Sequence, residues 1–246
     1  MRNVWIIARR EYKLFFISPT AYVVAFFFMI LLGWFFYSAL RDAIIQAAYQ
    51  SFAPGVQIII SPLVTLLLFV MPAITMKSIA EEMRMGTMEL LLTAPVKDWE
   101  LVVGKWLGAF LFMLTLLVLT WIFPIVLNFL IKPGIDQGVF LAGYLGLILM
   151  VASLVAIGVF ISSLFNNQVV VFLVSLAIVL VFWLVRPASD STGGLGNQIL
   201  TYLNFIDHYL SFYQGTINLS DVVYYLSMTS LALLLGTMSI EIRRWR

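Results

Sequence analysis

The sequence predicts an all-α integral membrane protein with six transmembrane helices. Hydrophobic residues make up 63% of its 246 positions and charged residues only 11%, whereas soluble proteins average about 45–50% and about 25%. A helix needs about 20 predominantly apolar residues to cross a bilayer. Six runs of roughly this length are present, at residues 20–40, 58–76, 102–131, 139–165, 169–185 and 221–240.

Ionisable side chains occur only at the edges of these runs, at Arg41, Lys77, Lys105, Arg186 and Asp221. Pro62, Pro72 and Pro124 lie inside the runs, and we expect them to kink helices rather than end them, because neighbouring helices can satisfy the freed backbone groups. Gly104 and Gly108 are four residues apart, a spacing that lets another helix pack closely.

The distribution of lysine and arginine predicts the orientation of the helices, because cytoplasmic loops carry an excess of these residues. If both termini share one side, eleven of the fourteen basic residues fall on that side and three on the other. We therefore expect both termini, and the segment 77–101, in the cytoplasm. The three outer residues are Arg41, Lys132 and Arg186.

Residues 1–17 have the pattern of an amphipathic helix that lies flat on a membrane surface. At 100° per residue one face carries Val4, Trp5, Ala8, Tyr12, Phe15 and Phe16. The basic residues Arg2, Arg9, Arg10 and Lys13 share the other face, and with Trp5 they form the expected membrane-surface set. Two interpretations remain open: a topology anchor, or an elbow helix that also touches a cytoplasmic partner.

The segment 77–101 is charged and interrupted by glycine. Its first part should continue the second span as helix until Gly86, since glycine is costly in a helix interior and tolerates a turn. Thr87 is a candidate N-cap for a short second helix, Pro95 should end that helix, and Asp98 is a candidate cap for the third span. The short helix would present the apolar residues Met88, Leu91 and Leu92, either to a partner or to the protein's own bundle.

The segment 187–220 is the longest expected outer loop. Its aromatic residues recur at three- and four-residue spacing, as in a helix that packs at the membrane interface, where tyrosine is enriched. An aromatic belt is one interpretation and a lid over an exit path is the other. The candidate residues are Tyr202, Phe205, His208, Tyr209 and Phe212.

Several kinds of chemistry are excluded by residue content. The chain has no cysteine and one histidine, His208, and it has no G-x-x-x-x-G-K-[ST] phosphate-binding loop. The six runs lack the carboxylates and histidines that serve as intramembrane proton relays. We therefore expect no catalytic residue, no bound cofactor and no metal site. A net charge of +2 gives no support for nucleic-acid binding, and any energy for work has to come from a partner.

The segment AEEMRMGTMELLLTAPVKDWELVVGK, residues 80–105, resembles the E-E/R-x-x-G-T-x-E-x-L-L-x-x-P-V…GK signature of ABC-2 type transporter permeases. The whole chain is most similar to the gliding-motility-associated (Gld-type) permeases. This resemblance implies an N-terminal connecting helix, a coupling helix after the second span and short extracytoplasmic helices before the sixth. The residues that it assigns to ATPase coupling are Glu81, Glu82, Arg84, Gly86, Thr87, Glu89, Leu90 and Pro95.

The resemblance also implies partners and a location. Separate ABC ATPase subunits would bind ATP and Mg²⁺, a second permease subunit would complete the pore, and a membrane protein with a large extracytoplasmic domain would join them. The chain would lie in the bacterial cytoplasmic membrane and convert ATP hydrolysis into export or transmembrane mechanical signalling. The alternative is a non-transporting scaffold that anchors an extracytoplasmic partner. The third possibility is an intramembrane enzyme, for which the sequence offers no catalytic groups.

Overall fold

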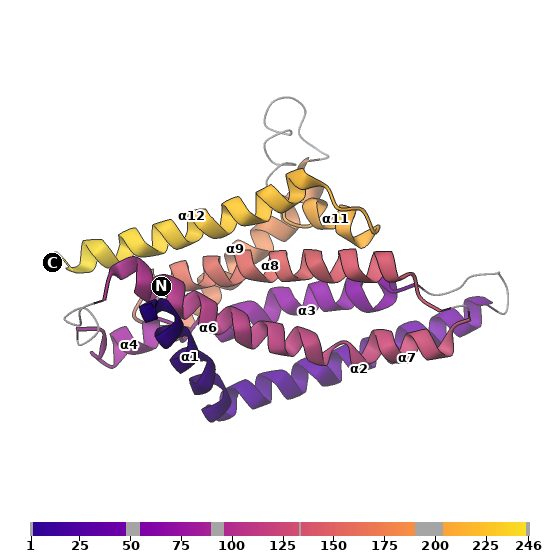
Figure 1. Ribbon diagram of the computed structural model, residues 1–246, viewed down its shortest axis with the longest axis horizontal. Coiled ribbons are helices and arrows are strands. Elements are labelled where there is room, and N and C mark those ends of the chain that lie inside the picture. Colours follow the sequence, from indigo (N-terminus) through magenta and orange to yellow (C-terminus); the bar gives the residue numbers. More distant parts are fainter. Residues whose placement is uncertain (1, 48–54, 90–95, 133, 190–203, 245–246) are drawn as a thin grey trace.

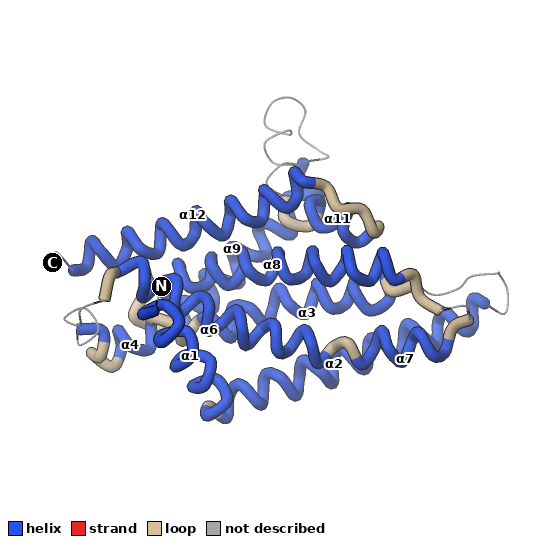
Figure 2. The backbone as a smooth tube through the Cα atoms, viewed as in Figure 1, coloured by secondary structure: helices blue, strands red, loops and turns tan. Residues whose placement is uncertain are grey.

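The computed structural model describes residues 2–47, 55–89, 96–132, 134–189 and 204–244, and the described residues form helices and loops without strands (Figures 1 and 2). The predicted all-α class is therefore confirmed for this part of the chain. The helices are α1 (Arg2–Ile17), α2 (Pro19–Ala47), α3 (Gln57–Thr75), α4 (Ala80–Arg84), α6 (Asp98–Leu119), α7 (Ile122–Leu130), α8 (Gln137–Leu164), α9 (Gln168–Ser189), α11 (Asp207–Tyr213) and α12 (Leu219–Arg244).

Five helical stretches in the described residues are long and apolar enough to cross a membrane: α2, α3 with α4, α6 with α7, α8 and α12. The fifth predicted run lies in α9, whose described apolar part, Gln168–Trp183, is shorter. The structure by itself therefore supports five candidate spans.

Helix α8 forms the centre of the bundle. It packs against α3, α6, α9, α11 and α12, and most of its apolar window is buried, whereas that of α2 is mostly exposed. Small residues make this position possible. A Cβ atom on Gly146 would lie 2.6 Å from the Phe212 side chain, and one on Gly143 would lie 2.4 Å from Ile60. Glycine at these positions lets α11 and α3 approach the α8 backbone.

The third predicted run, 102–131, is divided in two rather than continuous. Thr120 and Trp121 form a turn between α6 and α7. Pro124 has no N–H to donate to the carbonyl of Thr120, which removes one bond of the helical ladder. The Thr120 hydroxyl donates to the Leu117 carbonyl at 2.7 Å and lies 2.9 Å from the Tyr144 hydroxyl. Pro62 and Pro72, by contrast, lie within the continuous helix α3, as expected.

Both ends of the described chain lie at the same end of the bundle, which we call the terminal end (Figure 1). Asn3 of α1 donates to Glu100 at 3.0 Å, and Arg244 of α12 pairs with Asp98 at 3.2 Å, so both helices reach the start of α6. Helix α11 lies at the opposite end. Figure 2 shows α1 meeting α2 at an abrupt corner, where Ser18 is the only non-helical residue.

Candidate functional site

A buried lysine joins three elements at the terminal end of the bundle. Lys105 of α6 is only 2% exposed, and its Nζ lies 3.1 Å from Glu11 Oε1 of α1 and 2.9 Å from Glu82 Oε2 of α4. Nζ also donates to the Ser78 carbonyl at 2.7 Å, in the turn that precedes α4. An ammonium group has three N–H donors, and here Nζ donates hydrogen bonds to Glu11 and to the Ser78 carbonyl and forms an ion pair with Glu82. We call Lys105, Glu11, Glu82 and Ser78 the lysine node.

The charged groups of the lysine node are shielded from water, so each one depends on its partner inside the protein. Glu11 and Glu82 are both mostly buried, and removing one partner of a buried ion pair costs about 3–5 kcal/mol because the other charge is left uncompensated. Among the described residues, Lys105 is the cation that forms ion pairs with both carboxylates. Loss of this lysine would leave two carboxylates facing each other, so α1 and α4 would lose their shared attachment to α6.

Two glycines bring α1 against α6. A Cβ on Gly104 would lie 2.7 Å from the Ile7 side chain, and one on Gly108 would lie 2.5 Å from the Glu11 Cβ and 3.0 Å from the Ala8 carbonyl oxygen. The close packing predicted from the Gly104–Gly108 spacing is confirmed, and its partner is α1. Further along α1, the Tyr12 hydroxyl is 3.0 Å from Thr115 Oγ1.

Helix α4 is tied to α8 by a hydroxyl group. Ser162 Oγ accepts from the backbone N–H groups of Ile79 and Ala80, both at 3.0 Å. The first N–H groups of a helix have no acceptor within the helix itself, so this serine of another helix supplies one. Residues 84–89, at and after the end of α4, contain a turn, and we call this segment the elbow. Gly86 in this turn has φ +71°, in the left-handed region that glycine adopts readily. The predicted interruption at Gly86 is confirmed.

Comparison with known protein families identifies the family of this chain. A family model described as "ABC-2 family transporter protein" matches residues 5–242, nearly the whole chain. The chain belongs to this family. Comparison with curated proteins finds no significant match. Family membership makes the chain a multi-pass membrane component of an ABC transporter and implies that it associates with ABC ATPase subunits.

The coupling residues expected in this ABC-2 chain occupy different environments. Glu82 points inward to the lysine node, and Thr87, which is half-buried, donates to the Glu82 carbonyl at 3.3 Å. The helix that Thr87 is expected to cap extends beyond the described residues, so its capping role stays a prediction. Glu81 is half-buried. The residues exposed on the elbow are Arg84, Met85, Gly86 and Glu89, whereas Met88 is buried. Leu90, Leu91, Leu92 and Pro95 lie outside the described residues.

The start of α6 is capped by a different carboxylate from the one expected. Glu100 Oε2 accepts from the backbone N–H of Lys97 at 3.2 Å and from Asn3 Nδ2 of α1 at 3.0 Å. Asp98 instead pairs with Arg244 of α12. The prediction of Asp98 as the cap is therefore wrong, because the third residue of the helix, Glu100, reaches back to the free N–H group.

The face of α1 that packs against the bundle also differs from the expected one. Trp5 is 57% exposed and Phe16 is also exposed, whereas Ile7 and Glu11 turn inward beside Ala8. The four basic residues of the membrane-surface set, Arg2, Arg9, Arg10 and Lys13, are exposed as well. Trp5 and the basic residues therefore share the accessible surface of α1, so the membrane-surface role stays a prediction.

The aromatic residues of the outer segment are mostly packed into the bundle at the α11 end. Phe205, Tyr209 and Phe212 are each less than 4% exposed. Burial raises the pKa of Tyr209 well above its usual range, so the phenol stays protonated and donates to the Gly143 carbonyl at 3.1 Å. Tyr202 lies outside the described residues.

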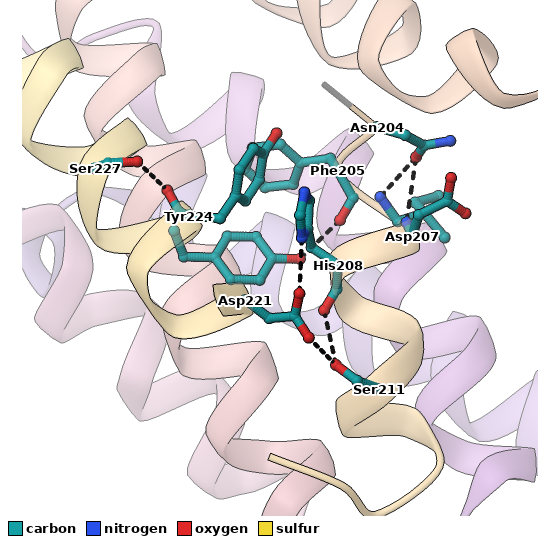
Figure 3. Close-up of polar contacts among 10 residues, drawn as sticks. Asn204, Phe205, Asp207, His208, Ser211, Asp221, Tyr224 and Ser227 are labelled. Atoms are coloured by element: carbon teal, nitrogen blue, oxygen red, sulfur yellow. Dashed lines mark hydrogen bonds and ion pairs between the residues drawn. The ribbon is translucent and has the colours of Figure 1, made fainter. Parts of the chain in front are cut away.

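His208 has a structural environment rather than a catalytic one. Its Nδ1 lies 2.8 Å from Asp221 Oδ1 of α12, and its ring stacks on Tyr224 with centroids 3.9 Å apart (Figure 3). The Ser211 hydroxyl donates to the other oxygen of Asp221. A nucleophilic serine would have to contact the histidine base, whereas here serine and histidine both bind the carboxylate. The described residues also contain no cluster of acidic and histidine side chains that could hold a metal ion.

Sequence reasoning missed Glu11 and underrated Lys105. Both carried a signal: Glu11 falls on the same helical face as Ala8 and Phe15, and Lys105 is the fourth residue of a predicted apolar run. A cation within an apolar run requires a buried counter-charge. Searching the neighbouring amphipathic helix for a carboxylate on its apolar face would have found the pair.

Proposed function

We propose that this chain is the permease subunit of a bacterial ABC-2 transporter, and that separate ATPase subunits with ATP and Mg²⁺ drive it to export a substrate or to transmit force. The observation that carries the proposal is the lysine node, which fastens α1 and α4 to α6. A push on α4 is then transmitted to the connecting helix and to a membrane-spanning helix together.

The exposed side of the elbow is the surface offered to the ATPase. Arg84, Met85 and Glu89 surround the Gly86 turn, and all three are exposed. Leu90 and Pro95, which follow directly in the chain, complete the expected coupling set. Glu82 acts from inside, because it holds α4 on Lys105.

The placement of α9 supports the proposal of a sixth span. Helix α9 begins shortly after α8 ends at Leu164. The Leu164 carbonyl accepts a hydrogen bond from Arg243 of α12, so this junction lies at the terminal end. Near the other end of α9, Phe182 packs against Phe205, which precedes α11, with ring centroids 5.8 Å apart and the rings tilted by 43°. Helix α9 therefore connects the two ends of the bundle, which supports six spans and both termini on one side. The excess of basic residues assigns that side to the cytoplasm.

The exposed apolar face of α2 supports a second permease subunit. Phe26, Phe27 and Trp34 are each at least 58% exposed, and their aromatic surface can face lipid or another permease. The finer Gld-type assignment adds a membrane protein with a large extracytoplasmic domain, and the α11 end is where such a partner would contact this chain.

The test uses the complex of permease and ATPase subunits purified from its native membrane. Arg84→Glu changes the exposed side of the elbow, and Gly86→Pro forces φ from +71° to about −65°. Both should weaken ATPase binding and lower ATP turnover by the complex, whereas the control Lys132→Glu, outside the elbow, should have no effect. Unchanged ATPase recovery and turnover in both elbow variants would refute the coupling role.

The same purification tests the scaffold alternative. A transporter subunit should be recovered together with a nucleotide-binding subunit. Recovery with an extracytoplasmic partner but without any ATPase would favour the scaffold.

A further inference from the structure

A cavity of about 530 Å³ lies between α1, α4 and the adjoining ends of α2 and α3. This volume falls within the range of ligand-binding pockets, about 300–1,000 Å³. Its wall includes Thr20 and Val24 in the first turns of α2 and Ile74 in the last turn of α3. Both helices are candidate membrane spans, so the cavity opens at the level where lipid head groups meet acyl chains.

The lining is divided into a charged part and an apolar part. Charged side chains come from α1, α4, the turn between α3 and α4 and Lys105 of α6, whereas Ala21, Val24, Ala73 and Ile74 line the side of the spans. A soluble metabolite would leave this apolar wall in contact with water. An amphiphile with a polar head and a hydrocarbon tail matches both parts.

Three of the charged groups are available to a ligand. Lys77 donates to Thr20 Oγ1 at 3.2 Å, its one hydrogen-bond partner among the described residues, so two of its three N–H donors remain. Arg10 and Glu81 have no ion-pair partner within the described ranges. Lys105, by contrast, is fully engaged by the lysine node.

The signs of these charges select the head group. The lining contains three cations, Arg10, Lys77 and Lys105, and three carboxylates, Glu11, Glu81 and Glu82. An anionic lipid would leave Glu81 without a counter-charge, whereas a zwitterionic head supplies a phosphate for the cations and an ammonium for the carboxylate. A primary ammonium can also donate hydrogen bonds to Glu81, which a quaternary ammonium cannot.

We propose that this cavity binds one zwitterionic phospholipid of the phosphatidylethanolamine class. The phosphate lies between Lys77 and Arg10, the ammonium group lies at Glu81, and the upper part of the acyl chains lies along Val24 and Ile74. The lipid thereby fills the wedge between the connecting helix and the elbow. This inference does not depend on the proposed coupling role.

The experiment measures lipid binding to the purified, delipidated permease by native mass spectrometry. The protein is incubated with an equimolar detergent-solubilised mixture of dioleoyl phosphatidylethanolamine, phosphatidylcholine and phosphatidylglycerol. The wild type should retain phosphatidylethanolamine in preference to the other two. Equal retention of all three, or preference for phosphatidylglycerol, would overturn the proposal.

Two variants and two matched controls localise the binding. Lys77→Gln should weaken phosphatidylethanolamine binding about tenfold, which corresponds to one lost charge-assisted hydrogen bond, and Glu81→Gln should remove the preference over phosphatidylglycerol. The controls Lys132→Gln and Glu241→Gln change exposed residues outside the cavity lining and should bind as the wild type does. Equal binding by Lys77→Gln and Lys132→Gln would overturn the assignment, provided that circular dichroism shows both variants folded.

A competition arm separates a lipid from a free head group. Soluble phosphoethanolamine carries the same phosphate and ammonium but no acyl chain. The lipid should remain bound at equal concentrations of the two, because the apolar wall contributes to binding. Displacement of the lipid under these conditions would contradict a lipid site.

Discussion

Replacing Lys105 with methionine should destabilise the permease more than any other single charge removal at the terminal end. Methionine keeps the length and most of the volume of the side chain, so the change removes the ammonium group without opening a large cavity. Lys105 then no longer compensates Glu11 and Glu82, and the Ser78 carbonyl loses its donor. Breaking a buried pair of this kind costs about 3–5 kcal/mol.

The assay is thermal unfolding of the purified permease in nanodiscs. For a chain of this size each kcal/mol lowers the melting midpoint by about 2–4 °C, so Lys105→Met should lower it by about 6–20 °C. The control Lys13→Met removes an exposed cation from α1 and should shift the midpoint by no more than about 4 °C, since exposed charges contribute about 0–1 kcal/mol.

A double-mutant cycle tests the reasoning directly. Glu82→Gln alone should cost less than Lys105→Met, because Lys105 keeps Glu11 and the Ser78 carbonyl. The double variant should be more stable than the sum of the single effects predicts, by about 0.5–3 kcal/mol, because Glu82 no longer needs a counter-charge. Simple additivity of the two changes, or a Lys105→Met midpoint within 2 °C of the wild type, would refute the node as a buried electrostatic link.

Three further predictions concern other contacts. Gly108→Leu should separate α1 from α6 and lower the melting midpoint, because even a Cβ atom would lie 2.5 Å from Glu11; Gly33→Leu, where a Cβ has ordinary contacts, is the control, and equal midpoints for the two variants would contradict the close packing. Ser162→Ala should raise hydrogen exchange at Ile79 and Ala80, which lose their acceptor, at a cost of about 1–3 kcal/mol; exchange as slow as in wild type would contradict this role. Asp221→Leu should lower the melting midpoint more than Asp42→Leu, since Asp221 accepts from both His208 and Ser211, whereas Asp42 is exposed; equal midpoints would show that this network adds no stability.

Patterns of apolar residues predicted most of the helices, because burial in lipid requires long apolar runs whatever their neighbours are. The interruption at Gly86 and the close packing at Gly104 and Gly108 could also be predicted from the sequence, since each depends on the missing Cβ atom of glycine. These features are local properties of the chain.

Features that depend on a partner helix were harder to predict. The turn at Thr120 and Trp121 reflects the loss of a hydrogen bond at Pro124 together with a hydroxyl contact to Tyr144 of α8, and Pro62 and Pro72 cause no such break. Trp5 faces outward because α6 accepts the side of α1 that carries Ala8 and Glu11. Helical periodicity alone does not show which of two adjoining faces packs.

The central claim is that α1, α4 and α6 move together when the ATPase acts. Spin labels on Arg84→Cys and Trp5→Cys, two exposed positions on α4 and α1, give the distance within this unit, and labels on Arg84→Cys and Lys132→Cys give a distance across the bundle. In the reconstituted complex, addition of ATP should leave the first distance unchanged and shift the second. A change in the distance between α4 and α1, or no change in either distance, would contradict the account.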